Sequence, residues 1–86
     1  MAVNLFIPQK FSDDGWRLKI RDNEYVEEPH VTLIGKETWR ISLRTGDCLD
    51  RIPPPAGIPR ELAYIIKKNL STYARFWNAE YPDNPA

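Results

Sequence analysis

The chain has 86 residues, with 12 basic and 12 acidic side chains and no formal net charge. This length corresponds to one domain, and a hydrophobic fraction of 42% with three tryptophans excludes a disordered chain. Zero net charge also excludes an overall field that steers nucleic acid, so such attraction would need local clustering of charge.

The single cysteine, Cys48, excludes an intramolecular disulfide and suits a reducing compartment. The first apolar stretch is interrupted by Pro8 and Lys10, which does not match a signal peptide. No apolar run approaches the roughly 20 residues of a membrane span. We therefore expect a cytoplasmic protein that does not contact a membrane.

The first half of the chain predicts β-structure. Residues 1–15 are expected to form an arm or an edge strand, and antiparallel strands are expected within 16–45. The segment WRLKIR, residues 16–21, alternates between apolar and basic side chains, as a half-buried strand does. PHVTLI and TWRISLR follow as two further strands, separated by a turn that begins at Gly35.

The second half predicts a connector and a helix. Residues 53–58 hold three prolines and are expected to form a stiff link, because proline lacks an amide donor. Residues 59–81 place apolar side chains in one broad stripe, which indicates one long helix. Asn69 falls inside that stripe, so we expect its amide to bond the sheet or the connector. Tyr64 projects from the charged side as a candidate contact residue.

Together these elements predict a single α+β domain over residues 1–86. Its two layers would be a three- to four-stranded antiparallel sheet and the long C-terminal helix, packed on one face of the sheet. The other face would then be open to a partner. The strand alternation places five basic side chains toward that face: Arg17, Lys19, Arg21, Arg40 and Arg44.

The basic residues allow three interpretations. Long Arg and Lys stems often cover solvated strand faces, and their charge deters edge pairing. The same side chains could contact the phosphates of RNA, or they could bind a protein partner with an acidic surface. No aromatic residue stands among them for base stacking, and Tyr25 in the neighbouring loop is the nearest candidate.

His30 is the only histidine and opens a predicted strand after Pro29. One interpretation is structural, with the imidazole bonding a loop carbonyl at the strand start. The other is catalytic: His30 would act as general base with Glu28 beside it, in a metal-independent ribonuclease. One histidine, one cysteine and scattered carboxylates show no metal-site spacing, and four isolated glycines form no phosphate loop. We expect neither a metal nor a cofactor.

The order of these segments resembles a large family of small bacterial proteins with the signature His-x-Pro-Pro-His. The resemblance covers residues 16–82: a basic strand, an acidic loop, a Pro-His step, the strand WRISLR followed by TGDCLD, a proline-bearing link and a closing helix. Only Pro29-His30 matches the signature, since Val26 and Glu27 stand where the first histidine is expected. The family often occurs in gene pairs resembling toxin–antitoxin modules, which implies such a pair here.

The sequence favours binding over catalysis, because a small domain with one histidine and no pocket signal offers little catalytic machinery. We expect a binding or regulatory protein of a toxin–antitoxin-like module that binds RNA or a protein partner through its basic sheet face. The ribonuclease is the alternative. A homodimer through an exposed sheet edge stays open as well.

Overall fold

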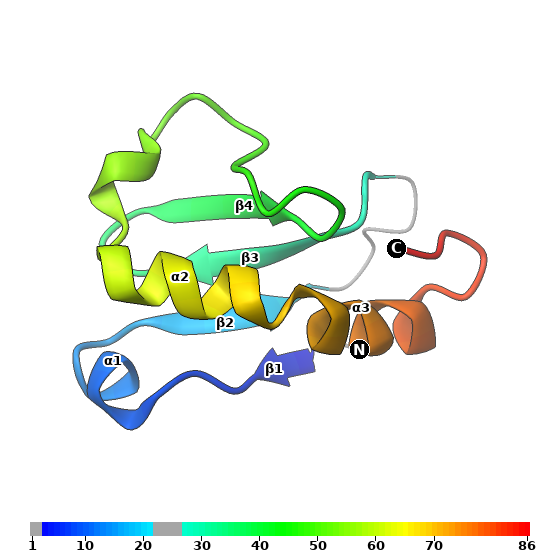
Figure 1. Cartoon of the computed structure of the whole chain (residues 1–86), viewed down its shortest axis with the longest axis horizontal. Coiled ribbons are helices and arrows are strands. Elements are labelled where there is room, and N and C mark those ends of the chain that lie inside the picture. The colour runs from blue at the N-terminus through cyan, green and yellow to red at the C-terminus, as the bar shows by residue number, and fades with distance from the viewer. Residues whose placement is uncertain (1–2, 22–26) are drawn as a thin grey trace.

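Four strands pair in the order of the chain to form an antiparallel meander, and helices cover one face of it (Figure 1). The structure is a computed structural model that describes residues 3–21 and 27–86. Its elements, in chain order, are β1 Val3–Leu5, α1 Gln9–Asp13, β2 Arg17–Ile20, β3 His30–Ile34, β4 Thr38–Ser42, a 3-10 helix Pro55–Gly57, α2 Arg60–Lys68 and α3 Leu70–Glu80. The predicted α+β fold with an antiparallel sheet and a C-terminal helix is confirmed.

The strand register separates apolar from charged positions, as the alternation predicts. Leu18 lies opposite Leu5 on β1 and opposite Leu33 on β3, and Leu33 in turn lies opposite Trp39 on β4. All four side chains are buried. One position along, Lys19, Thr32 and Arg40 form the next row of partners. Because successive strand residues face opposite sides, this second row belongs to the other face of the sheet.

The prediction of one continuous helix over 59–81 is wrong at Asn69, which separates α2 from α3. Its backbone has φ −112° and ψ 16°, and its side-chain amide donates to the carbonyl of Ile65 at 2.8 Å. The expected bond from this amide to the sheet or the connector is therefore wrong too. Asparagine offers the backbone a local hydrogen bond that competes with helical pairing, which explains the interruption.

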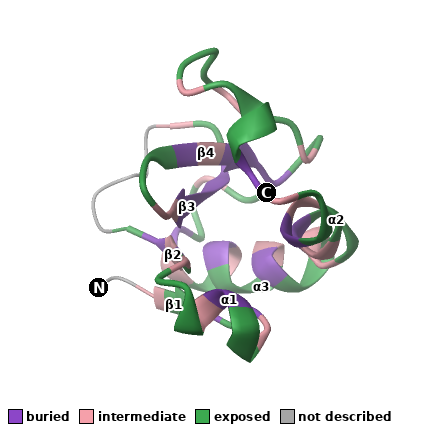
Figure 2. Cartoon of the chain, turned by 90° about the vertical axis from the view of Figure 1, so that its left-hand side faces the viewer, coloured by how far each residue is buried: buried purple, intermediate pink, exposed green. Residues whose placement is uncertain are grey.

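The hydrophobic core lies between the strands and helices α2 and α3, where the buried residues gather (Figure 2). Helix α2 contributes Leu62 and Ile66, and α3 contributes Tyr73 and Trp77. Each pair is spaced four residues apart, which puts both members on the same side of the helix. Burial of each such large apolar side chain contributes about 1.5–3 kcal/mol.

The two edges of the sheet are finished differently. Beyond β4 the chain folds back along this strand. The backbone amide of Ser42 donates to the backbone carbonyl of Asp47 at 2.9 Å, and the amide of Leu49 donates to the carbonyl of Arg40 at 2.8 Å. The other edge is β1, which lies within the residues 1–15 that were expected to form an arm or an edge strand. The short helix α1 in that segment was not predicted, because five residues show no helical period. Among the described helices, none is long and apolar enough to cross a membrane.

Candidate functional site: the charged face of the sheet

The sheet face opposite α2 and α3 carries Arg17, Lys19, Thr32 and Arg40, and we call it the charged face. Arg17 and Lys19 stand two residues apart on β2, so both project to the same side. Arg40 belongs to the same row as Lys19, with Thr32 between them. The structure therefore brings together three of the five basic residues that the sequence assigned to one surface.

Arg40 is already occupied by carboxylates. Its Nε and Nη2 donate to the two carboxylate oxygens of Asp50 at 2.8 and 2.7 Å, and its Nη1 donates to Glu27 at 3.1 Å. Charge-assisted pairs with two parallel bonds are stronger and more directional than single contacts. The hydrogen bonds that Asp50 accepts from Arg40 hold the pKa of its carboxyl below the ordinary value. Around Arg40, therefore, the face is mixed in charge rather than uniformly basic.

The charges of Arg17 and Lys19, unlike that of Arg40, are not paired with a described residue of the chain. Arg17 is exposed and Lys19 is half-buried. Neither has an ion pair or side-chain hydrogen bond with any residue in the described ranges 3–21 and 27–86. They are the cations of the charged face that a partner can reach without first displacing a described carboxylate of this chain.

The other two predicted contact residues lie away from this row. Arg21 follows the last residue of β2 and is exposed, and its backbone carbonyl accepts a hydrogen bond from the hydroxyl of Tyr81. Arg44 lies in the turn after β4, where its Nη2 donates to the carbonyl of Pro85 at 3.3 Å. Strand β4 ends at Ser42, so Arg44 lies in the turn and does not follow the strand alternation. Extending that alternation to residue 44 therefore assigns Arg44 to the wrong place.

Thr32 lies at the centre of the charged face and is only 1% exposed. Among the described residues its hydroxyl has no hydrogen-bond partner. Lys19 and Arg40 flank it in the strand register. A buried hydroxyl without a partner costs free energy, so this row of the sheet is less stable than a fully apolar one would be.

His30 is 0% exposed and packs against Trp77, with ring centroids 5.5 Å apart. Its Nδ1 lies 2.8 Å from the backbone carbonyl of Glu28, so Nδ1 carries the proton and donates it. The expected bond between the imidazole and a loop carbonyl is confirmed. In this conformation the imidazole makes structural contacts, with the Glu28 carbonyl and with the ring of Trp77.

The carboxylate of Glu28, the second candidate catalytic group, is used elsewhere. It accepts a hydrogen bond from the hydroxyl of Ser42 at 2.6 Å. The same hydroxyl accepts from the backbone amides of Arg44 and Thr45 at 3.1 and 3.3 Å. Glu28 thus anchors the turn after β4. Tyr25, which the sequence proposed for base stacking, lies outside the described residues.

Tyr64, the other candidate contact residue, is 61% exposed on α2. The ammonium of Lys68, one helical turn later, lies 5.3 Å from the centre of its ring. Within the part of the chain that the structure describes, no three His, Cys, Asp or Glu side chains gather in a way that could hold a metal ion.

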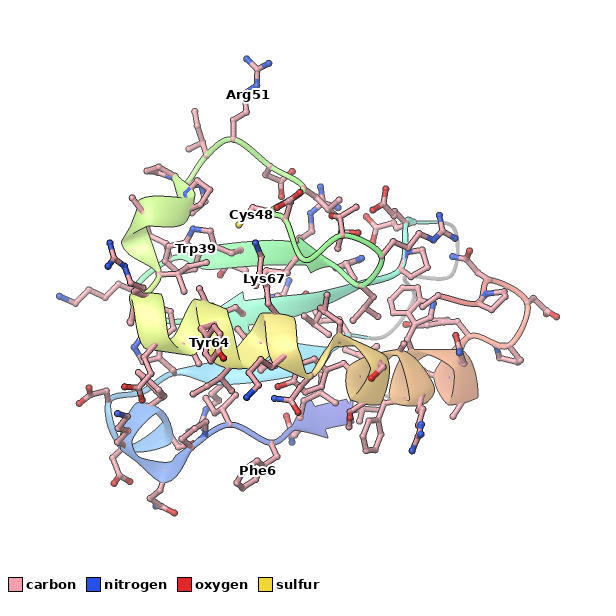
Figure 3. The ribbon with its side chains drawn as sticks, viewed as in Figure 1. Phe6, Trp39, Cys48, Arg51, Tyr64 and Lys67 are labelled. Atoms are coloured by element: carbon pink, nitrogen blue, oxygen red, sulfur yellow. The ribbon has the colours of Figure 1, made fainter. Side chains whose placement is uncertain are left out.

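Sequence reasoning missed a cavity beside Cys48. It lies between the segment after β4 and helix α2, with Lys67 at its rim (Figure 3). Cys48 and Lys67 come from distant parts of the chain, and only the observed path of the connector brings them together. No pattern of neighbouring residues could have indicated this site.

Comparisons with protein-family models, with curated proteins and with solved structures find no match for this chain. A function for this protein must therefore be inferred from its own residues, on the charged face and around the cavity beside Cys48.

Proposed function

We propose that this protein is a non-catalytic binding and regulatory module that docks an acidic surface of a protein partner on the charged face. The observation that carries the proposal is the pair of cations on β2. Arg17 and Lys19 project from one side of a strand whose pairing on both flanks holds the backbone in place. Cations on a rigid scaffold gain more from an acidic partner than mobile ones, because less conformational freedom is lost on binding.

A protein partner fits this face better than RNA. Arg40, at the centre of the predicted basic surface, is surrounded by the carboxylates of Asp50 and Glu27, and these would repel phosphates. The described part of the face also has no aromatic ring for base stacking. Mixed charge, with two cations that pair with no described carboxylate, is typical of surfaces that select a protein by charge complementarity.

We also propose that the partner is encoded next to this protein, as in a toxin–antitoxin-like pair. The support for this setting is the resemblance of residues 16–82 to the small bacterial family with the His-x-Pro-Pro-His signature. The buried imidazole of His30 favours the binding member of such a pair over a ribonuclease. A homodimer through the edge strand β1 is the competing arrangement, and the molar mass in solution distinguishes it.

Affinity capture from an extract of the source cells tests the proposal with a charge-reversed variant. Arg17→Glu combined with Lys19→Glu should weaken capture of one specific protein by at least tenfold, because two attractions become repulsions. Lys68→Glu with Arg75→Glu changes the net charge equally on exposed helix positions and should capture normally. Loss of capture in both double variants would sink the proposal. If nuclease treatment abolished capture, the partner would be RNA rather than a protein.

A further inference from the structure

The cavity between α2 and the segment after β4 has a volume of about 280 Å³. Its walls are apolar and buried, formed by Ile41 of β4, Ile58 of the connector and Ile66 of α2. Its rim is polar and consists of Asp47, Cys48 and Lys67. Apolar walls with a few polar groups at one side are typical of small-molecule sites, and this volume lies just below their usual range of about 300–1,000 Å³, so it suits a ligand of few heavy atoms.

The stem of Lys67 packs beside Gly46, and its side chain is exposed at the rim. Gly46 lies against the stem of Lys67, and a Cβ built at this glycine would lie 3.1 Å from the Cγ of the lysine. Gly46 also has a φ of +81°, which glycine adopts without strain. In Figure 3 the side chain of Lys67 rises from α2 toward Cys48.

The charge of Lys67 is only weakly satisfied. Its nearest described counter-ion is Asp47, with the amine nitrogen 3.9 Å from the carboxylate oxygen, too far for a hydrogen bond. The thiol of Cys48 does not compete for this cation. Burial, and then the charges of Asp47 and Asp50, raise the pKa of the thiol, which keeps it neutral. An ammonium at the mouth of an apolar cavity therefore still has donors to offer to an anion.

We propose that this cavity binds a small monocarboxylic acid with an apolar tail. The tail would lie between Ile41, Ile58 and Ile66, and the carboxylate would accept hydrogen bonds from the amine of Lys67. A single cation at the rim matches one negative charge, whereas a phosphate dianion would leave charge uncompensated beside Asp47. This site lies on the helix-covered side of the sheet and does not depend on the function proposed for the charged face.

Protection of Cys48 from alkylation tests the site directly. Cys48 is the only cysteine, so the mass added by iodoacetamide reports on this cavity alone. Octanoate should slow the labelling in a saturable way, butyrate should need a higher concentration, and octanol should need about tenfold more than octanoate because it lacks the charge. This comparison uses the unaltered chain, so no variant needs to fold. Equal protection by octanol and octanoate would overturn the proposal.

Three variants test whether the carboxylate of the ligand binds at Lys67. Lys67→Met should raise the octanoate concentration for half-protection about tenfold, whereas Lys68→Met, on the next residue of the same helix, should leave it unchanged. Asp47→Asn should lower it, because a competing carboxylate is removed. Comparing concentrations rather than rates separates binding from changes in thiol reactivity. Equal loss in both lysine variants, or no protection by octanoate at any concentration below micelle formation, would refute the site.

Discussion

Arg40 and Asp50 form a two-bond pair that ties the loop after β4 back to the strand. The guanidinium donates through Nε and Nη2 to both carboxylate oxygens, at 2.8 and 2.7 Å. The pair sits beside the backbone bond from Leu49 to Arg40, so side chain and main chain fix the same crossing of loop and strand. The Arg40–Asp50 pair thus holds both the position of Arg40 on the charged face and the loop that folds along the β4 edge of the sheet.

Asp50→Asn should lower the free energy of unfolding by up to about 1 kcal/mol at neutral pH, the upper range for an exposed ion pair. The pKa of Asp50 is lowered in the folded chain. Its stabilisation is therefore complete above the ordinary carboxyl pKa of about 3.9 and is lost as the pH falls through the lowered value. Urea unfolding of both proteins across this pH range should show their difference shrinking toward acid pH.

Asp83→Asn is the matched control for that series. Asp83 is exposed, and no ion pair with another described residue involves it. A difference between wild type and Asp50→Asn that persists unchanged in strong acid would contradict the role of the Arg40 pair.

Thr32→Val should stabilise the protein by about 1 kcal/mol. The substitution removes a buried hydroxyl that has no described partner and replaces it with an apolar group of similar shape. Thr38→Val, at an exposed position of β4, should change little. Urea midpoints of the two variants provide the comparison, and a destabilised Thr32→Val protein would show that the hydroxyl has a partner in solution.

His30→Ala should lower the free energy of unfolding by about 1–3 kcal/mol, because it leaves the Glu28 carbonyl without its donor and opens a space beside Trp77. His30→Gln retains an amide donor and should recover part of the loss. Thermal unfolding followed by circular dichroism measures both. A His30→Ala protein as stable as wild type would contradict this structural role. If that stable variant were also biologically inactive, the result would support the ribonuclease alternative.

Gly35→Ala should cost about 1–3 kcal/mol, because a Cβ at this position would lie 2.6–2.9 Å from three ring atoms of Trp16. The indole is stacked on Trp39, with centroids 5.6 Å apart, so it has little room to retreat. In a Trp16→Ala background the same substitution should cost less. A double-mutant cycle from urea unfolding gives the coupling, and additive losses would show that glycine is needed for another reason.

The strand faces could be predicted from sequence because their period is local. Leu18 and Lys19 point to opposite sides of β2 whatever the rest of the chain does. The occupation of Arg40 could not be predicted, since Asp50 reaches it only through the backward fold of the loop after β4. The same holds for the cavity, where Cys48 and Lys67 meet through the connector.

Helix prediction failed at a single residue for a related reason. The apolar stripe continues through Asn69, so the period alone indicates one helix. The interruption depends on an asparagine amide that bonds the carbonyl of Ile65. His30 shows the converse: the residue type suggested chemistry, whereas its burial against Trp77 came from the packing of α3.

The meander has a consequence for how the chain reaches its native state. Each of the four described strands pairs with its neighbour in the sequence, so forming the sheet requires only short stretches of the chain to close into loops. Topologies dominated by such nearby pairings cross their kinetic barrier quickly. We therefore expect rapid, concentration-independent refolding after dilution from denaturant.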